Sequence, residues 1–165
     1  MATSFTAEPA DVVLAVCAGV GRLVAGRLDD RERELQLDRL AELYAVHTDV
    51  RHPFAPLGDT PLRTRAELRE HFAAGPGRTA GAERFAATDV TVHRTADPEV
   101  VVVEFRYRGT VEGRPFAIPC IFVARVRDGE IVESRDYADH VGFARAFGAL
   151  PALAATLADD DGPAH

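Results

Sequence analysis

The residue of this chain best suited to chemistry is a carboxylate in the middle of a strand-like run. Residues 114–127 and 130–139 alternate like two strands, and Asp128-Gly129 between them is typical of a tight hairpin, because the turn requires positive φ. One face of the second strand carries Val132, Ser134, Asp136 and Ala138, and the other carries Ile131, Glu133, Arg135 and Tyr137. If the first face is turned inward, desolvation raises the pKa of Asp136 and makes it useful as an acid or base near neutral pH.

Two roles are open for Asp136. Aspartate has a low strand propensity, so a specific interaction must hold it in mid-strand. That interaction is either catalysis or ligand binding, or a structural ion pair with Arg51 or Arg135. Ser134 lies on the same face and can donate a hydrogen bond to the carboxylate.

A histidine before a proline is the second candidate. His52 precedes Pro53 and shares a face with Val50 and Phe54 in a strand expected over residues 47–54. Its imidazole titrates near neutral pH, which suits proton transfer. A histidine on an apolar face also fits a core position with its hydrogen bonds satisfied, so both interpretations stand.

Two further candidates lie on the later strands. Tyr107 shares a face with Phe105, and its hydroxyl can contact a substrate or bond within the core. Cys120 lies in an apolar strand with no base beside it in sequence. It is therefore expected to pack as a small hydrophobic side chain rather than to act as a nucleophile.

Three polar residues lie near helix ends or helix faces. His71, on a predicted helix, either lines the mouth of a pocket around Asp136 or is exposed to solvent. Asp139 and His140 follow the last strand, where they are expected to cap a helix first and to form a pocket rim second.

Composition excludes several classes of function. The chain has 165 residues and a net charge of −7, which argues against a partner held through nucleic-acid phosphates. Cys17 and Cys120 are far apart and are expected to be reduced thiols of a cytoplasmic protein. We find no secretory signal pattern and no apolar run long enough to span a bilayer. The histidines lack the spacing of a metal site and no phosphate-binding loop is present, so we expect no metal and no cofactor.

The order of the elements predicts an α+β fold with helices on one face of a curved sheet. Helices are expected over residues 9–28, from a cap at Asp29-Asp30 through Tyr44, from a Thr64–Glu67 capping box, and over residues 141–157 with an interruption near Gly148. Strands are expected over residues 47–54, 85–94, 100–110, 114–127 and 130–139. We expect a single domain over residues 1–158, with a loose leader over 1–8 and a disordered polar tail over 159–165.

The strand at residues 114–127 is apolar on both faces in its middle. One face is expected to meet the helices. Exposure of the other face, around Ile121 and Val123, to water is unfavourable, so we expect this face to form a sheet-to-sheet homodimer contact.

Four stretches of the chain resemble a known superfamily: Asp49–Pro56, Arg65–Phe72, Phe122–Glu130, and Arg135-Asp136-Tyr137 with the helix Phe143–Gly148 after it. With the element order, they resemble the nuclear transport factor 2-like superfamily. More narrowly they are similar to the SnoaL-like polyketide cyclases, the phenazine biosynthesis A/B proteins and the ketosteroid isomerases. The resemblance covers about residues 30–153. It implies a cone-shaped α+β barrel in which three helices pack on a curved antiparallel or mixed sheet.

The resemblance also implies roles for two residues. The acidic residue of Arg-(Asp/Glu)-Tyr, which is Asp136, faces the pocket as general acid or base, and His52 occupies the position of the ketosteroid isomerase base. The tyrosine and protonated aspartate of those isomerases have no evident match. Limonene-epoxide hydrolases share Arg-Asp-Tyr but add an Arg-x-Asp pair, and the nearest counterpart, Glu104-Phe105-Arg106, has the opposite order. Both of these activities are therefore disfavoured.

We accordingly expect a cofactor-independent acid/base enzyme of small-molecule, secondary metabolism. It would be a cyclase or isomerase acting on a hydrophobic cyclic or polyketide-like substrate, with Asp136 transferring the proton and His52 as its partner. Tyr107 and Ser134 would orient the substrate, and the other predicted contacts are Phe54, Phe105, Ile118, Cys120, Phe122 and His71. The alternative is a non-catalytic ligand-binding or scaffold dimer of the same fold.

Overall fold

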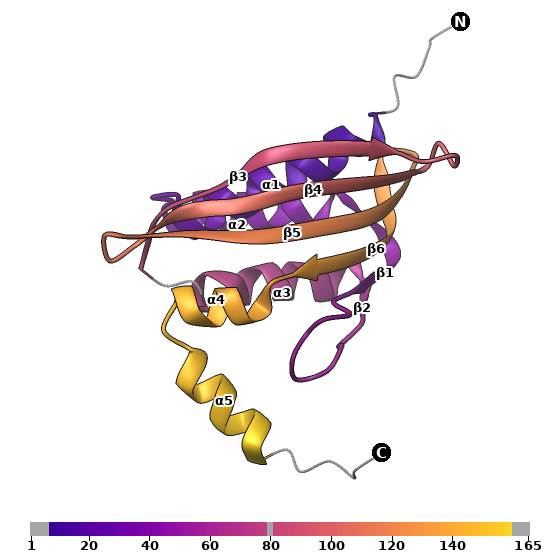
Figure 1. Ribbon diagram of the computed structural model, residues 1–165. Helices are drawn as coiled ribbons and strands as arrows, with labels where there is room; N and C mark the ends of the chain where they lie inside the picture. The colour runs from indigo at the N-terminus through magenta and orange to yellow at the C-terminus, as the bar shows by residue number, and fades with distance from the viewer. Residues whose placement is uncertain (1–6, 79–80, 160–165) are drawn as a thin grey trace, which may run out of the picture.

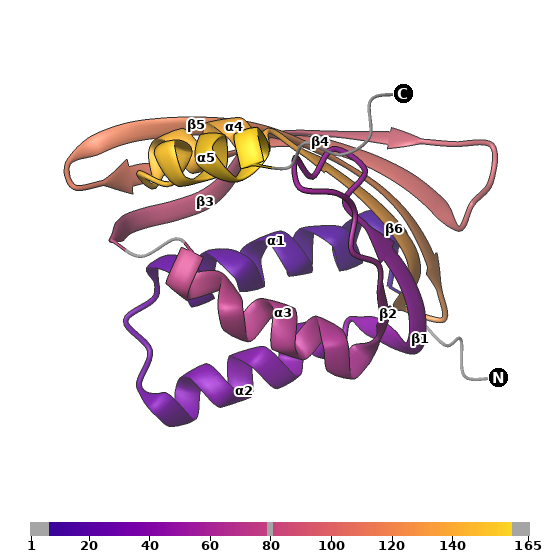
Figure 2. The same cartoon turned by 90° about the horizontal axis from the view of Figure 1, so that it is seen from below.

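A curved mixed sheet wraps around the first three helices of this protein (Figures 1 and 2). The computed structural model describes residues 7–78 and 81–159, which contain five helices and one six-stranded sheet. The helices are α1 (Pro9–Ala25), α2 (Asp30–Ala41), α3 (Arg65–Arg78), α4 (His140–Ala146) and α5 (Leu150–Asp159). The strands are β1 (Tyr44–Arg51), β2 (Leu62–Thr64), β3 (Ala82–Arg94), β4 (Val100–Val111), β5 (Arg114–Arg127) and β6 (Glu130–Ala138). The predicted α+β class is confirmed.

The sheet has the order β2-β1-β6-β5-β4-β3 and does not close into a barrel. Strands β3 to β6 form antiparallel hairpins, as their short connections predicted. Strand β1 instead pairs parallel with β6, with Val50 beside Ser134 and Arg51 beside Arg135. This pairing places the end of β1, where His52 follows, next to Asp136.

The turn and the register of the last hairpin follow from local chemistry. Asp128 and Gly129 both have positive φ, 53° and 82°, as the tight turn requires. Val126 pairs with Ile131, and the next residue of β5 toward its start, Arg125, pairs with Glu133. Val132 therefore has no partner on β5 and forms a bulge.

The bulge corrects the predicted face of one residue. Ile131 was placed on the outer face of the strand but is buried. Because the extra residue shifts the alternation by one position, Ile131 and Ser134 both lie on the inner face, whereas Val132 is only partly buried. The inner placement of Ser134 and Asp136 is confirmed.

Helix α1 connects the two halves of the core. Val12, Val16 and Leu23 pack with α2, α3 and the β1–β6 end of the sheet. Val13 and Cys17, on another face of the same helix, pack against β3, β4 and β5. Gly21 permits the close approach of α1 to β3, since a Cβ at this position would lie 2.8 Å from the carbonyl oxygen of Phe85.

The helix caps agree with the sequence prediction, while several boundaries differ. Asp29 forms a capping box with Glu32, and Thr64 forms one with Glu67. Strand β1 covers Tyr44–Arg51 rather than 47–54, and α1 ends at Ala25. The short strand β2 was not predicted. The predicted leader falls largely, and the predicted tail almost wholly, outside the described residues, although Asp159 is the last residue of α5.

Candidate functional site

A buried carboxylate forms the centre of the candidate site. Asp136 is 7% exposed and lies across from Phe122 on the inner face of the sheet. The Ser134 hydroxyl donates a hydrogen bond to its Oδ1. Burial raises the pKa of Asp136 to about 7, and the Ser134 hydrogen bond and the Arg135 charge oppose this rise only partly. The carboxyl group can therefore exchange a proton near neutral pH.

Neither arginine proposed as a partner of Asp136 forms an ion pair with it. Arg135 donates to the Asp49 carboxylate at 2.9 Å, and Arg51 binds Asp49 at 2.8 Å and Asp59 at 3.4 Å. The side chains of Arg51 and Arg135 thus belong to a network with Asp49, and the structural ion-pair interpretation of Asp136 was wrong.

His52 lies beside the buried carboxylate, as predicted. Its Nε2 is 4.0 Å from Asp136 Oδ2, and its backbone N–H donates to Asp59 Oδ1 at 2.8 Å. Its ring stacks on His71 of α3 with centroids 5.3 Å apart. The loop after β1 and helix α3 therefore hold the imidazole within reach of any small molecule that touches Asp136.

A third histidine, at the start of α4, joins this group. The His140 ring stands edge-on to His52, with centroids 6.4 Å apart. Asp139 caps α4 by accepting a hydrogen bond from the Gly142 backbone N–H at 2.7 Å, as predicted. Burial lowers the pKa of His140, and the Asp139 charge offsets this only in part. His140 was noted from sequence as a rim residue but was not among the predicted site residues.

Aromatic rings pack against one another on the inner face of the sheet, the face that also carries Asp136. Phe105 contacts Tyr107 and Phe122 with centroids 4.9 and 5.0 Å apart. Phe143 of α4 approaches Tyr107 at 6.2 Å, and Phe85 does so at 4.6 Å. Burial in this interior disfavours the ionised carboxylate and is the cause of the raised pKa of Asp136.

Most predicted site residues gather at this interior. Tyr107, Ile118 and Cys120 are buried, and Phe105 is buried beside Phe122. Ser134 and His52 lie beside Asp136, and His71 lies one ring further away, stacked on His52. Burial raises the pKa of Cys120 to about 12, so its thiol stays protonated at neutral pH.

Phe54 is the exception. Its side chain is 69% exposed and contacts Tyr137, at 5.1 Å between centroids, on the outer side of the sheet. The predicted strand ends at Arg51, so the alternation that placed Phe54 with Val50 does not continue. The structure does not bring Phe54 to Asp136.

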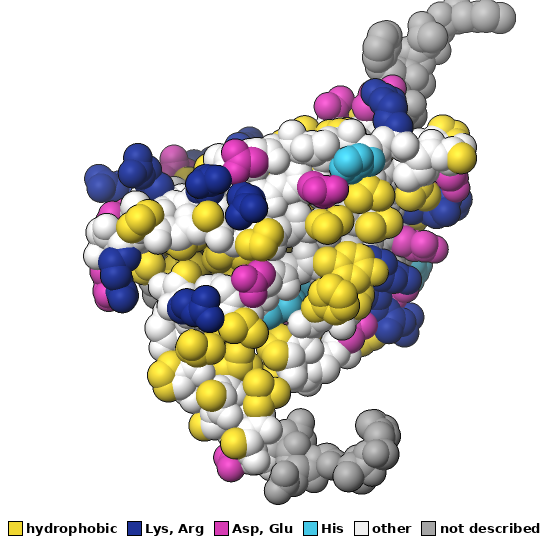
Figure 3. All heavy atoms as spheres, in the orientation of Figure 1, with side chains coloured by type: hydrophobic (Ala, Val, Ile, Leu, Met, Phe, Trp, Pro, Cys, Tyr) yellow, Lys and Arg dark blue, Asp and Glu magenta, His cyan; other side chains and the backbone are white. Residues whose placement is uncertain are grey.

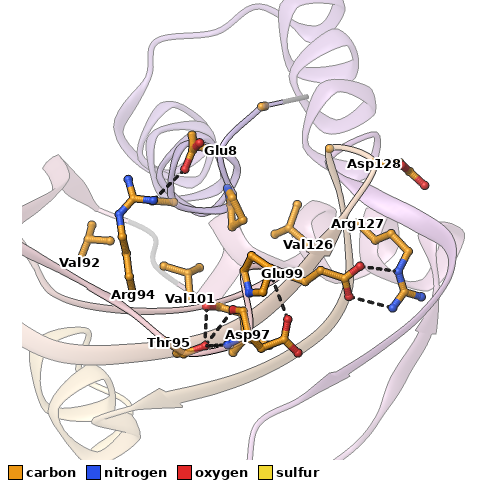
Figure 4. Close-up of a pocket in the computed structure, with 16 residues that line it drawn as sticks. Glu8, Val92, Arg94, Thr95, Asp97, Glu99, Val101, Val126, Arg127 and Asp128 are labelled. Carbon is orange, nitrogen blue, oxygen red and sulfur yellow. Dashed lines mark hydrogen bonds and ion pairs between the residues drawn. The ribbon is translucent and has the colours of Figure 1, made fainter. Parts of the chain in front are cut away.

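Two hollows lie away from the buried carboxylate. One, of about 490 Å³, lies between the start of α1 and the β3–β4 and β5–β6 turns (Figure 4). Its charged side chains bind one another: Arg94 pairs with Glu8, and Arg127 pairs with Glu99. The other, of about 480 Å³, lies between α2, β1 and α3 around Val46 and Arg69.

The described residues show neither a metal cluster nor a membrane helix. Across residues 7–78 and 81–159, no group of three or more histidine, cysteine, aspartate or glutamate side chains is arranged to hold a metal ion. Among the helices in those ranges, none has the length and apolar character needed to cross a bilayer. What the site does offer is a proton donor and acceptor in an aromatic enclosure with imidazoles at its edge.

Comparisons with known proteins agree with this fold. The profile of the SnoaL-like domain family matches residues 25–134, a range that ends just before Asp136. An uncharacterized PhzA/B-like protein of Pseudomonas aeruginosa is 36% identical over 119 residues, which are 68% of this chain and 79% of that protein. A solved Bacillus subtilis protein, provisionally assigned as an isomerase, is 26% identical with a TM-score of 0.60, covering 84% of this chain and 96% of its own. Wild-type IdmH of Streptomyces antibioticus, provisionally described as a polyketide cyclase, is 25% identical with a TM-score of 0.59, covering 86% and 99%.

Proposed function

Because the chain belongs to the SnoaL-like domain family, we propose that it is an acid/base enzyme that moves a proton on a carbon atom next to a carbonyl group. Its substrate is a hydrophobic cyclic molecule, and its reaction is an isomerisation or a cyclisation. The observation that carries the proposal is a buried carboxyl group with a pKa of about 7 inside an aromatic enclosure. The isomerase and polyketide cyclase named among the similar structures support the reaction class.

The chemistry assigned to each residue follows from its position. Ionised Asp136 removes a proton from the carbon next to the carbonyl, and the electron pair moves onto the carbonyl oxygen. His52, with Nε2 4.0 Å from Asp136 Oδ2, donates a hydrogen bond to that oxygen. Asp136 then returns the proton to another carbon in an isomerisation. In a cyclisation the carbanion attacks a second carbonyl carbon, whose oxygen takes up the proton.

A non-catalytic ligand-binding protein is the second candidate. The contact among the interior rings, with Phe105 touching both Tyr107 and Phe122, fills space beside Asp136 and so favours a non-catalytic protein, in particular the scaffold form of this alternative. A ligand must displace some of this packing in order to reach Asp136. In this second function, Asp136 only forms a hydrogen bond to the ligand, and asparagine replaces it with little loss of binding.

Deuterium exchange into a simple ketone separates the two candidates. The probe is 2-tetralone, which has a fused hydrophobic ring and an acidic C–H next to its carbonyl, in buffered D₂O followed by proton NMR. Wild-type protein is expected to accelerate exchange over buffer. Asp136→Asn is expected to lower the protein-catalysed rate by about 10² to 10⁴, with binding largely kept. The matched control is Glu133→Gln, which changes an exposed carboxylate of the same strand.

The outcomes assign the function as follows. Exchange that depends on Asp136 and is unchanged in Glu133→Gln supports the enzyme. Exchange that proceeds equally in Asp136→Asn removes the role proposed for that carboxylate. Tight binding of 2-tetralone without accelerated exchange supports the ligand-binding protein instead.

A further inference from the structure

A buried nitrogen atom beside His52 has no hydrogen-bond partner among the described residues. This atom is Nε2 of His140. We propose that His140 contacts the bound small molecule directly, and that its Nε2 forms a hydrogen bond with an oxygen atom of that molecule. The proposal rests on the proposed small-molecule site around Asp136, and it adds a residue and a required chemical feature of the ligand.

The energetic argument starts from the cost of burial. A buried polar atom without a partner loses its hydrogen bonds to water and gains none in return, so such atoms are rare and call for an explanation. The neighbouring polar groups are already paired: Ser134 donates to Asp136, and Asp139 accepts from Gly142. A ligand oxygen at His140 Nε2 would satisfy the atom that the fold leaves unpaired.

The position of His140 places it at the same site as Asp136. Its ring stands edge-on to His52, which in turn lies against Asp136. Three residues further along α4, Phe143 packs on Phe85 and Tyr107, so the helix is fixed against the aromatic enclosure. A molecule that enters between α4 and the sheet would meet His140 on one side and Asp136 on the other.

The charge of His140 narrows the kind of oxygen it would bind. Burial lowers the pKa of His140 and so favours the neutral imidazole. The charge of Asp139 opposes this lowering, but the Asp139 carboxylate is already engaged as the cap of α4. A neutral imidazole donates to a carbonyl or accepts from a hydroxyl, and it gives little support to an anion such as a phosphate. The predicted ligand is therefore an uncharged ring compound with a hydroxyl or carbonyl oxygen.

Two probes that differ by one oxygen atom test the proposal. We compare 2-naphthol with naphthalene, measuring affinity by calorimetry and the His140 imidazole nitrogens by ¹⁵N NMR, with the His140→Gln spectrum giving the assignment. Saturation with 2-naphthol is expected to shift the His140 Nε2 resonance, and naphthalene is not. His140→Phe is expected to weaken 2-naphthol about tenfold with little effect on naphthalene, and His140→Gln to restore much of the loss.

The matched control is His93→Gln, because His93 lies on the outer face and pairs with Glu104. It is expected to leave both affinities unchanged. If His140→Phe does not fold, His140→Gln and the wild-type NMR titration still decide the matter.

An unshifted His140 Nε2 resonance at saturation, or equal 2-naphthol affinity in wild type and His140→Phe, overturns the His140 proposal. Failure of both probes to bind wild-type protein overturns that proposal and the small-molecule site together. If wild-type protein shows no Asp136-dependent exchange of 2-tetralone, but 2-naphthol shifts the His140 Nε2 resonance, only the enzyme proposal is overturned.

Discussion

At the scale of single residues, desolvation decides the behaviour of Asp136. The Ser134 hydrogen bond and the Arg135 charge both favour the ionised form, yet the pKa is raised from 3.8 to about 7. Burial of the carboxyl group, opposite Phe122 on the inner face of the sheet, therefore has the larger effect. A carboxyl group of this kind destabilises the fold whenever it is ionised.

This cost predicts that Asp136→Asn stabilises the protein at high pH. Below pH 3.8 the carboxyl is protonated in both the folded and the unfolded chain, and there is no penalty. As pH rises from 3.8 through 7, the unfolded chain ionises first, so wild-type stability falls, and it stays lower above pH 7. A shift of about three pKa units corresponds to about 4 kcal/mol. The stability gain of Asp136→Asn is therefore expected to grow by up to about that amount from pH 4 to pH 8.

Urea unfolding of both proteins at a series of pH values measures this gain. Glu133→Gln serves again as the control, since an exposed carboxylate is expected to give a pH-independent difference within about 0.5 kcal/mol. A gain for Asp136→Asn that is constant with pH would show that the carboxyl is not desolvated in solution.

At the scale of elements, local signals predicted the sequence order but not the long-range contacts. The Asp128-Gly129 turn, the cap at Asp29, the Thr64–Glu67 capping box and the break near Gly148 are local patterns, and each is observed. The parallel pairing of β1 with β6 joins residues more than 80 positions apart, and no local pattern reports it. The resemblance to a known superfamily supplied the architecture that periodicity alone could not.

Residues whose positions were predicted wrongly, or whose contacts were not predicted, depend on irregular backbone or on distant elements. The bulge at Val132 moved Ile131 inward, and the end of β1 at Arg51 left Phe54 outside. The stacking of His52 on His71 depends on how α3 crosses the end of β1. The unpaired nitrogen of His140 becomes visible only once its surroundings are known. A histidine directly after a helix-capping aspartate was the available sequence signal.

Helix α4 is the element expected to yield when a ligand enters. It has no fully buried residue. Its aromatic contacts with the interior are Phe143 against Phe85 and Tyr107 and, at its C-cap, Phe147 against Phe116. Phe143→Ala is expected to destabilise the fold by about 1 to 3 kcal/mol, less than for a fully buried ring. It is also expected to accelerate amide exchange in residues 139–149 about tenfold or more, with the amides of β4 and β5 unchanged.

Hydrogen exchange with mass spectrometry tests this expectation. The matched control is Val141→Ala on the same helix, where the side chain is 44% exposed and contributes little packing. If both variants accelerate exchange equally, or if β4 and β5 also open, Phe143 is not the contact that holds α4.

At the scale of the whole molecule, the two faces of the sheet differ in what they can do. The inner face is filled by helices and aromatic rings, whereas the outer face mixes charges with apolar side chains (Figure 3). Ile121 is 40% exposed in the middle of β5 and pairs across the sheet with Glu104 and Tyr137. Tyr137 in turn contacts the exposed Phe54. Ile121, Tyr137 and Phe54 thus form an exposed apolar group centred on β5, a central strand, where exposure of apolar side chains to solvent is unfavourable.

We propose that this outer face joins two copies of the chain, as expected from the sequence. A two-fold contact would bury Ile121, Val123 and Tyr137 of each copy against the other. Sedimentation velocity is expected to give twice the 17.8 kDa chain mass for wild type and a monomer for Ile121→Glu at micromolar concentration. Leu35→Glu, the same kind of change at an exposed aliphatic residue of helix α2, is the matched control and is expected to remain dimeric. A wild-type monomer, or an Ile121→Glu dimer of unchanged affinity, would place the contact elsewhere.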